Sequence, residues 1–456
     1  NYPMPIIADL HLHSKYSRAV SQKMDLWEIA AWAAKKGIGL VAIPDWTHPL
    51  FFREIKKNLS EVAPGIFSLI KTKDENLKKI KFIFATEISS IYSQDGKMRR
   101  VHNLIFSPSL ETAEKIIGEF ERRGFNILSD GRPIIGLSSK ELLELILTID
   151  KNSFLVPCHI WTPWFSVFGS KSGFDSLEEC FGNLSKQIYA VETGLSSDPV
   201  MNWQIKELGT RSIVSFSDAH SGLKLGREAT VFVENTNSKL KVQSSKFSYQ
   251  DIIDALKQKP DGKLKIGYTI EFFPEEGKYH WSGHRSCQLR YSPQEIKEKG
   301  VICPVCQKPL TVGVEDRVVD LAQKIIDKKS LLFIKNQSGV TFVYDQEKKR
   351  RPFVSLIPLF EVFLEINNNS PTKALAEYER LVTTFAPEFE ILLRKSYEQI
   401  EATGGKKLRQ AIEIIRNRQV FVDPGYDGVF GKVKIFPENN LTEENHQSYE
   451  NQPSLF

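Results

Sequence analysis

Short apolar stretches alternate with longer amphipathic stretches over residues 1–265. Seven of the short stretches are rich in β-branched and aromatic residues and predict strands: MPIIADLHLH, IGLVAIPD, IKFIFATEIS, VHNLIF, NSFLVPCH, IYAVETG and RSIVSFSDAH. Between them, DLWEIAAWAAKKG, SLETAEKIIGEFERRG and SKELLELILTID have the apolar spacing of amphipathic helices. Strands that alternate with helices predict βαβ units, a parallel sheet and, with seven strands, a closed or nearly closed α/β barrel.

Histidines and carboxylates stand at the ends of six of these seven predicted strands. Active sites of such barrels lie at the carboxyl ends of the strands, so these side chains are expected to meet. His11 and His13 have a spacing of two on a strand end, which points both imidazoles to one side, as binding of a single ion requires. One histidine alone is more often structural, but the whole set favours a metal site. The candidate metal ligands are His11, His13, Asp45, His48, Glu87, His102, His159, Asp218 and His220.

The motifs around these residues resemble those of a known superfamily. In order, DLHLHS, PDWTHP, TEIS, VHNLIF, PCHIW and SFSDAH are similar to motifs of the polymerase and histidinol phosphatase (PHP) superfamily of metal-dependent phosphoesterases. The resemblance implies a distorted (β/α)7 barrel that holds two or three Zn or Mn ions. It implies two overlapping ligand sets, namely His11, His13, Glu87 and Asp218 for one ion and Glu87, His102 and His159 for another.

The sequence departs from the superfamily at a third ion, to which His220 would belong. Family members often have a histidine near the position of Ala19 and another at the position of Trp46. We expect His48, together with Asp45, to substitute for them.

The ligand types and their number predict phosphoryl chemistry. Cations about 4 Å apart lower the pKa of a water, place it in line and stabilise charge on the attacking and leaving oxygens. Mixed nitrogen and oxygen ligands suit Zn or Mn better than Mg. We therefore expect Asp218, Glu87 and His159 to be catalytic through these ions. Arg227 is a candidate for binding the phosphate, and an ordinary surface arginine is the alternative.

A second metal motif follows the predicted barrel. His284 and Cys287 form one close pair and Cys303 and Cys306 another, with fifteen residues between the pairs. This spacing is typical of a structural tetrahedral zinc site, in which no ligand position remains for water. His280 is a weaker candidate for the fourth ligand. A module this small cannot bury a sufficient core, so the zinc is expected to supply much of its folding free energy.

The order of motifs over residues 4–435 narrows the resemblance to the endonuclease Q family. The segments that carry it are ETGLSSDPVMN, SDAHS, FFPEEGKYHWSGHRSC, CPVCQKPLTVGVEDRV, RPFVSLIPLFEV and PGYDGVFG. The resemblance implies a DNA repair endonuclease that recognises hypoxanthine, uracil, xanthine and abasic sites and hydrolyses the phosphodiester 5′ of the lesion. Its partner would be damaged DNA. Two alternatives remain: a PHP-type phosphatase of small phosphate esters or nucleotides, and a DNA-binding scaffold without activity.

An enzyme of this kind has to inspect a base outside the stack. The loop after His159 contains aromatic residues suited to stacking on an extruded base, and the segment after the sixth strand contains polar residues suited to its edge. Packing onto the barrel is the alternative for the aromatic residues, and support of the metal ligands is the alternative for the polar ones. The candidates are Trp161, Trp164, Phe165, Ser197 and Asn202.

The pattern changes after the zinc motif. We expect a barrel at 1–265, a zinc-binding module at 266–318, a mainly helical DNA-binding domain at 319–435 and a flexible tail at 436–456. A plain helical cap is the alternative for the third part. The tail ends in a pentapeptide that resembles the motif by which bacterial proteins bind the replication sliding clamp, with candidate contacts at Gln452, Leu455 and Phe456.

Composition agrees with this picture. With 41% hydrophobic and 26% charged residues and no long apolar run, the sequence predicts a soluble, cytoplasmic protein, and we expect a monomer. Three of the five cysteines lie within residues 287–306, which favours metal binding over disulfides. The net charge of +5 permits a polyanionic partner.

Overall fold

A large mixed sheet forms the centre of the protein. The computed structural model describes residues 5–238 and 247–437. The sheet has the strand order β15-β16-β17-β12-β11-β1-β2-β5-β4-β3, and β6, β7 and β8 extend it from β5. Its strands are β1 (Ile6–Asp9), β2 (Leu40–Ile43), β3 (Leu59–Ala63), β4 (Ile66–Leu69), β5 (Lys81–Gln94), β6 (Lys97–Phe106), β7 (Ile134–Ile135), β8 (Phe154–Pro157), β11 (Ala229–Glu234), β12 (Leu264–Glu271), β15 (Leu332–Lys335), β16 (Thr341–Tyr344) and β17 (Phe353–Ser355). A separate parallel pair consists of β9 (Ala190–Glu192) and β10 (Ser212–Val214).

All seven predicted strands are present, as β1, β2, β5, β6, β8, β9 and β10. The three predicted helices are confirmed as α1 (Leu26–Lys36), α4 (Leu110–Arg122) and α5 (Ser139–Ile149). Local chemistry sets their ends: the Asp25 side chain accepts hydrogen bonds from the first turn of α1, and Gly37 ends that helix in the left-handed conformation. A capping box of Ser138 and Glu141 begins α5.

The prediction of a parallel sheet is wrong, and closure into a barrel is not confirmed. β1 pairs with β2 in parallel but with β11 antiparallel, and β6 lies antiparallel between β5 and β8. Among the described residues, no ladder joins β8 to β9 or β10 to β11. Across the first gap, the Ile160 N–H donates to the Glu192 carbonyl and the His159 N–H to the Glu192 carboxylate. Across the second, the Thr230 hydroxyl accepts from the Ser215 N–H and donates to the Ser215 carbonyl. The β9–β10 pair is thus linked to the main sheet by isolated hydrogen bonds rather than by a ladder.

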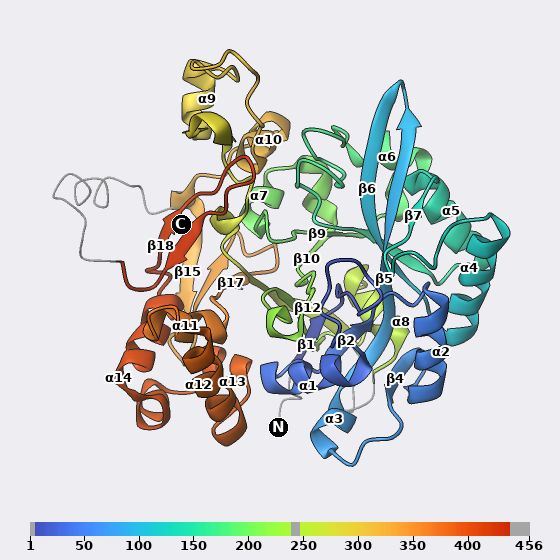
Figure 1. Ribbon diagram of the computed structural model, residues 1–456, viewed down its shortest axis with the longest axis horizontal. Helices are drawn as coiled ribbons and strands as arrows, with labels where there is room; N and C mark the ends of the chain where they lie inside the picture. The colour runs from blue at the N-terminus through green and yellow to red at the C-terminus, as the bar shows by residue number, and fades with distance from the viewer. Residues whose placement is uncertain (1–4, 239–246, 438–456) are drawn as a thin grey trace.

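β5 and β6 form one long hairpin (Figure 1). Its turn is Asp95-Gly96, and both residues have positive φ, the geometry of a tight two-residue hairpin turn. The strands extend well beyond the sheet, so Glu87 and His102 lie within the hairpin rather than at its ends.

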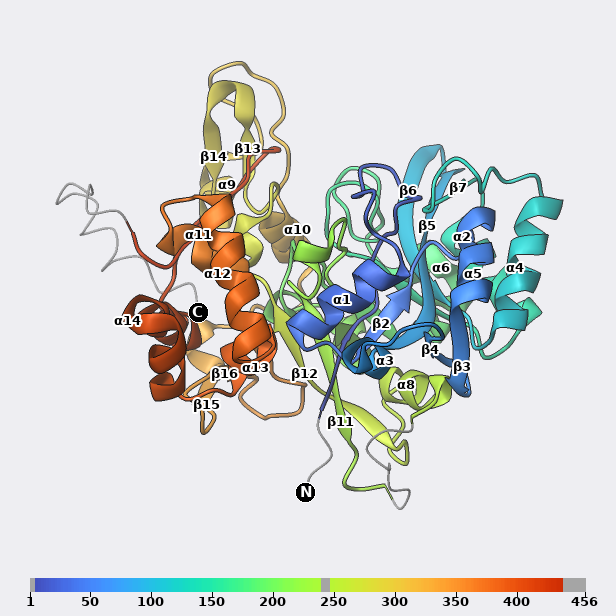
Figure 2. The same cartoon turned by 60° about the horizontal axis from the view of Figure 1, so that its bottom comes forward.

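Helices cover the outside of the sheet near the hairpin, with α2 (Pro49–Asn58), α4 and α5 side by side in both views (Figures 1 and 2). α4 buries Ala113, Ile116, Ile117 and Phe120 on one face. Other helices of this half are α3 (Glu75–Lys79), α6 (Leu177–Phe181), α7 (Pro199–Trp203) and α8 (Tyr249–Leu256).

The zinc motif lies in a small projecting module (Figure 2). Its elements are β13 (Ser282–His284), β14 (Leu289–Tyr291) and α9 (Pro293–Lys299), and α10 (Val314–Leu321) follows it. Tyr291, Cys303 and Leu310 are its buried core residues, a small set compared with the main core.

The C-terminal part combines strands with a helical group. Its helices are α11 (Leu359–Ile366), α12 (Pro371–Thr384), α13 (Glu388–Leu393) and α14 (Tyr397–Arg416), and a short hairpin of β18 (Phe421–Asp423) and β19 (Lys432–Lys434) follows. Gly405, with φ 85°, interrupts α14. β17 pairs in parallel with β12, so this part continues the central sheet.

A buried ion pair also joins this part to α1. The Lys36 ammonium lies 2.7 Å from a Glu388 carboxylate oxygen, and both side chains are almost fully buried. None of the helices that the structure describes is long and apolar enough to cross a membrane.

Candidate functional site

Glu87 lies at the centre of two groups of potential metal ligands. In the first group, one donor atom from each of His11, His13, Glu87 and Asp218 lies within 4.8 Å of every other. The His13 Nε2 atom is 3.3 Å from Glu87 Oε2 and 3.0 Å from Asp218 Oδ1. His11 Nε2 is buried and has no hydrogen-bond partner. A buried, unpartnered imidazole nitrogen that faces two carboxylates suits a cation between them.

The other carboxylate oxygen of Glu87 faces the second group. Glu87 Oε1 lies 2.5 Å from His102 Nδ1 and 3.2 Å from His159 Nε2. In the β5–β6 register Glu87 is opposite Leu104 and Ser89 is opposite His102, so Glu87 and His102 are diagonal neighbours on one face of the hairpin. One carboxylate therefore contributes an oxygen to each group, as a bridge between two ions requires.

Unusual backbone conformations place several of these side chains. Asp45, His159 and Asp218, which follow β2, β8 and β10, all have positive φ. Such conformations are costly for residues with a Cβ atom and cluster at functional sites. Gly194 permits the turn at His159, because a Cβ atom on it would lie 2.3 Å from the His159 Cβ atom.

Buried carboxylates hold the two histidines of the first motif. The His11 Nδ1 atom lies 2.9 Å from Glu192 Oε1, and His13 Nδ1 lies 3.4 Å from Asp45 Oδ1. The Glu192 carboxylate also accepts a hydrogen bond from the His159 N–H. These contacts fix the rings with their Nε2 atoms toward Glu87, the arrangement by which carboxylates orient metal-binding histidines.

Two further acidic groups near the ligands behave differently from Glu87. Burial raises the pKa of the Cys158 thiol, which lies near His11 and Glu192, well above its usual value. Burial also raises the pKa of Asp9 to about 6, against the hydrogen bonds that its carboxylate accepts from Ser217. For Glu87, burial opposes the charge, but His102 and Arg132 hold the pKa well below its ordinary value.

Four predicted site residues lie beside the two groups rather than in them. Asp45 is occupied by His13, by the N–H and hydroxyl of Ser14 and by the Ser17 hydroxyl. The His48 Nε2 atom faces the Leu128 carbonyl at 3.1 Å.

The other two of these four contact the backbone after β10. The His220 Nδ1–H faces the backbone carbonyl of Asp218, and its ring lies 4.6 Å from that of His13. The Arg227 guanidinium donates to the Ser217 carbonyl at 3.1 Å, so this arginine supports the segment that carries Asp218.

A pocket of about 420 Å³ opens beside His102 and His159. Its other lining residues are Arg100, Arg132, Thr162, Pro163, Trp164, Phe165 and Tyr279. Of the aromatic candidates, Trp164 and Phe165 line it, whereas Trp161 is buried and donates its indole N–H to Asn202. Asn202 in turn donates to the Ser197 hydroxyl. These last three side chains are core residues in the structure, which leaves them no free face for a base.

Sequence reasoning missed Arg132, Arg100 and Tyr279. Arg132 has its Nη1 atom 3.1 Å from Glu87 Oε2 and lines the pocket. It precedes β7, a strand of two residues, which is too short to show the alternation of apolar and polar residues that predicts a strand. Tyr279 comes from the segment before the zinc motif, and its ring lies 5.5 Å from that of Trp164.

The four residues of the zinc motif lie close together, as the sequence predicts. One donor atom from each of His284, Cys287, Cys303 and Cys306 lies within 4.8 Å of every other. Desolvation opposes the Cys303 thiolate, but backbone N–H groups of Cys306 and Val305 lower its pKa to about 6. Thiolate character favours a metal ion such as zinc. His280 is not in this group; its Nε2 atom lies 3.6 Å from a Glu315 oxygen.

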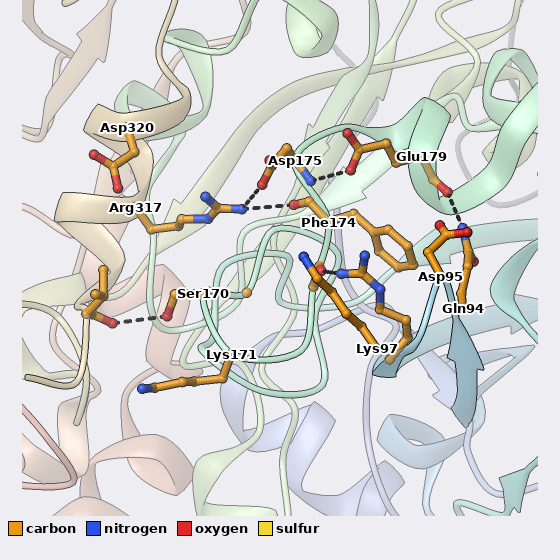
Figure 3. A pocket seen from close by; sticks show the side chains of 14 residues that line it. Gln94, Asp95, Lys97, Ser170, Lys171, Phe174, Asp175, Glu179, Arg317 and Asp320 are labelled. Carbon is orange, nitrogen blue, oxygen red and sulfur yellow. Dashed lines mark hydrogen bonds and ion pairs between the residues drawn. The ribbon is translucent and has the colours of Figure 1, made fainter. Parts of the chain in front are cut away.

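A charged groove of about 770 Å³ separates the hairpin tip from α10 (Figure 3). Residues 94–99, residues 169–175 and α10 contribute to its lining. Arg317 of α10 donates to the carbonyls of Phe168 and Phe174 and to the Asp175 carboxylate. The lining holds both signs of charge, with the cations Lys97, Arg99, Lys171 and Arg317 and the carboxylates Asp95, Asp175, Glu179 and Asp320.

Comparison with known sequences gives two uncharacterized relatives. No family model matches the chain. An uncharacterized protein of Methanocaldococcus jannaschii is 28% identical over 282 residues, which is 61% of this chain and 32% of that protein, so this chain spans about a third of its length. The uncharacterized protein YqxK of Bacillus subtilis is 27% identical over 443 residues, or 94% of this chain and 99% of YqxK.

Comparison with solved structures gives full-length matches. The lesion-specific endonuclease PfuEndoQ from Pyrococcus furiosus is 27% identical, with a TM-score of 0.77 over 98% of this chain and 99% of that one. A structure of endonuclease Q in complex with a 27-mer duplex that has an abasic lesion at the active site gives the same TM-score and identity, over 97% of this chain. The chain thus resembles endonuclease Q along its whole length, which confirms the resemblance predicted from its motifs.

Proposed function

We propose that the protein is a metal-dependent DNA repair endonuclease that recognises hypoxanthine, uracil, xanthine and abasic sites and hydrolyses the phosphodiester 5′ of the lesion. The observation that carries the proposal is the full-length similarity to a lesion-specific endonuclease, including a complex with an abasic lesion. The two His/carboxylate groups that share Glu87 supply the chemistry this activity needs. Recognition of the deaminated bases is the part that rests on the sequence motifs.

The ligand sets fit two Zn or Mn ions in the barrel region, one in each group. Their histidine and carboxylate donors suit these metals better than Mg. When bound, such ions activate water and stabilise the charge that develops on the phosphate oxygens. A third ion would have to use His220, because Asp45 and His48 already face other partners.

The chain's own residues would orient this site. Glu87 stays ionised and presents one oxygen to each group, and Asp218 presents its carboxylate to His13. Glu192 and Asp45 fix the rings of His11 and His13, so the ligand atoms need little rearrangement on substrate binding. Thr162 contacts His159 Nδ1 at 3.2 Å and fixes that ring in the same way.

We propose that the pocket beside His102 and His159 takes the extruded nucleotide. Trp164 and Phe165 offer aromatic faces there, and Tyr279 packs against Trp164. Base stacking on aromatic residues tolerates different bases, which fits an enzyme with several lesions as substrates. Trp161, Ser197 and Asn202 would shape the wall behind the pocket from the core.

The zinc module and the C-terminal helices are proposed to contact the duplex on either side of the lesion. A structural zinc on His284, Cys287, Cys303 and Cys306 would hold this module. Lys97 and Lys171, in the groove between α10 and the hairpin, would contact phosphates of the duplex.

Two proposals concern partners. Gln452, Leu455 and Phe456, which lie outside the described residues, would bind the sliding clamp, and a chain without residues 452–456 should lose binding to a bacterial clamp. We also propose that the protein acts as a monomer, which light scattering at the concentration of the nicking assay tests.

Nicking of defined duplexes tests the function. Purified protein with Mn or Zn is incubated with end-labelled duplexes that contain one hypoxanthine, uracil, xanthine or abasic site, or no lesion. We expect a nick immediately 5′ of each lesion and none in the undamaged duplex. Asp218→Ala should abolish nicking, whereas Asp261→Ala, which removes an exposed carboxylate, should not.

Other outcomes would assign other functions. Release of phosphate from small esters without nicking would support the phosphatase alternative and contradict the repair assignment. Specific binding of lesion duplexes without turnover, at full metal content, would support the scaffold.

A further inference from the structure

Arg132 belongs to a loop that is fixed against the metal-binding strands. β7 pairs in parallel with β5, with Ile134 opposite Ser89. Two residues before Ile134 and two before Ser89, the same register places Arg132 beside Glu87. Parallel pairing thus brings a guanidinium to the carboxylate that both ligand groups share.

The loop itself has little freedom. The Gly131 N–H donates to the Tyr16 carbonyl, and the Asp130 carboxylate accepts from the N–H groups of Arg18 and Arg132. Only a glycine fits at position 131, since a Cβ atom there would lie 2.4 Å from the Asp45 carboxylate. The backbone before Arg132 is therefore held in close contact with the segments that follow β1 and β2.

The guanidinium is anchored on one side and faces the pocket on the other. Its Nη1 atom is 3.1 Å from Glu87 Oε2, its side chain is 26% exposed, and it lines the pocket with His102 and His159. Among the described residues, the guanidinium of Arg132 donates a side-chain hydrogen bond to the Glu87 carboxylate. A guanidinium has five N–H donors in a planar fork, so an anchored arginine still presents donors to a ligand.

We propose that Arg132 is a catalytic residue that binds a non-bridging oxygen of the scissile phosphate. This is the role that sequence analysis gave to Arg227, whose guanidinium instead supports the backbone near Asp218. The proposal deepens the proposed function and rests on it only in requiring a phosphodiester substrate. Donors fixed before the reaction, and aimed where negative charge develops, need no reorganisation in the transition state.

The anchor at Glu87 gives Arg132 a defined position relative to both ligand groups. Arginine binds phosphate through two parallel hydrogen bonds, whereas lysine acts as a point charge. Arg132→Lys should therefore recover only part of what Arg132→Ala loses. Arg18→Ala is the matched control, because Arg18 pairs with Asp130 of the same loop but its side chain is 72% exposed.

The first measurement uses a substrate without a base. On bis(p-nitrophenyl) phosphate, we expect Arg132→Ala to lower kcat about 10²-fold with a smaller change in KM, as loss of one oxyanion donor does. Arg18→Ala should match the wild type. This ester has no lesion, so the result stands apart from the test of lesion recognition.

The second measurement is binding without turnover. The holoenzyme is titrated with a nicked product duplex whose lesion strand begins with either a 5′-phosphate or a 5′-hydroxyl. We expect the wild type and Arg18→Ala to prefer the phosphate, and Arg132→Ala to lose about 10-fold of that preference. The barrel metal content of all variants, measured by mass spectrometry, should stay the same.

Two results would overturn the proposal. An unchanged preference for the 5′-phosphate in Arg132→Ala would exclude a phosphate contact. Loss of barrel metal in parallel with activity, in both the alanine and the lysine variant, would mean that Arg132 only positions Glu87.

Discussion

The two metal-binding regions of this molecule are built in opposite ways. The ligands around Glu87 come from residues 11–218 and from separate strands of a large sheet with an extensive core. The ligands of the zinc module come from residues 284–306, around a buried core of Tyr291, Cys303 and Leu310. In the first region the fold places the ligands, whereas in the second the ligands have to help make the fold.

This difference indicates whether the metal of each region would contribute to the chemistry or to the folding free energy. The carboxylates of Glu192 and Asp45 orient His11 and His13, so the metal would contribute chiefly to the chemistry rather than to the fold. The zinc module has too little apolar surface to fold alone, so its metal would supply folding free energy. Four substitutions, taken from the largest expected effect to the smallest, test this contrast.

Cys303→Ser should have the largest effect, since structural zinc contributes about 10 kcal/mol to the folding of such modules. We expect one zinc fewer per chain and loss of hydrogen-exchange protection over residues 282–310, with protection of β1, β2 and β5 retained. Val305→Ala, at a 70% exposed position of the same turn, is the control. Retained protection over the module would show that it folds without metal.

Glu87→Gln removes the charge that both barrel ligand groups share. We expect nicking to fall at least about 10³-fold, through loss of metal and of transition-state stabilisation. The melting temperature should change little compared with Cys303→Ser, because the surrounding core is intact. Glu54→Gln, at a carboxylate that accepts from Tyr16, is the control. Unfolding of the barrel in Glu87→Gln would contradict the idea that its fold precedes its metal.

Glu192→Gln weakens the support of His11 rather than a ligand. Loss of such a partner typically lowers metal affinity about 10- to 100-fold, so activity should be recovered at higher Mn or Zn concentrations. Titration of the nicking rate with metal measures this shift, with Glu121→Gln as an exposed control. An unchanged metal dependence would indicate that the strands alone orient His11.

Asp316→Asn tests the junction between the two regions, and we expect it to have the smallest effect of the four substitutions, a change in the free energy of unfolding. Asp316 accepts a hydrogen bond from Ser282, and burial raises its pKa from 3.8 to about 6. The protonated carboxyl is favoured in the folded state, so its stabilising contribution is complete below pH 3.8 and is lost as pH rises through about 6. Relative to Asp316→Asn, the wild type should lose on the order of 1 kcal/mol between about pH 5 and pH 8.

Denaturant unfolding at each pH measures this difference for Asp316→Asn. Subtracting the variant from the wild type cancels the proton dependence of the zinc ligands, which both proteins share. Glu298→Gln removes an exposed carboxylate of α9, in the same module, and is the control. A difference that does not change with pH would rule out the raised pKa.

The sequence was sufficient to locate the strands and the ligands that follow them. Apolar stretches with β-branched residues and the positions of His11, His13, Glu87 and Asp218 relative to them required no tertiary knowledge. The zinc motif was equally local, since its four ligands are set by spacing within one module. The full-length similarity to endonuclease Q agrees with the order of these motifs.

The direction of the strands and of several side chains could not be predicted. The Asp95-Gly96 turn makes β5 and β6 antiparallel, a hairpin signal that the alternation of strands and helices obscured. Spacing places Asp45 and Trp161 near the site. It does not predict that the Asp45 carboxylate accepts hydrogen bonds from serines, or that Trp161 is buried in the core. Arg132 depends on the register of β7 with β5, which no local pattern encodes.

The pairing of β12 with β17 has a consequence for attempts to shorten the chain. β12 has β11 on one side and β17 on the other, so residues beyond the zinc module cover an edge of the barrel sheet. A chain cut after the module would leave the backbone N–H and C=O groups of Thr269–Glu271 without their β17 partners, an open edge that other copies could extend. Truncation would thus favour aggregation, and the contribution of the C-terminal helices is better dissected by surface substitutions in the intact chain.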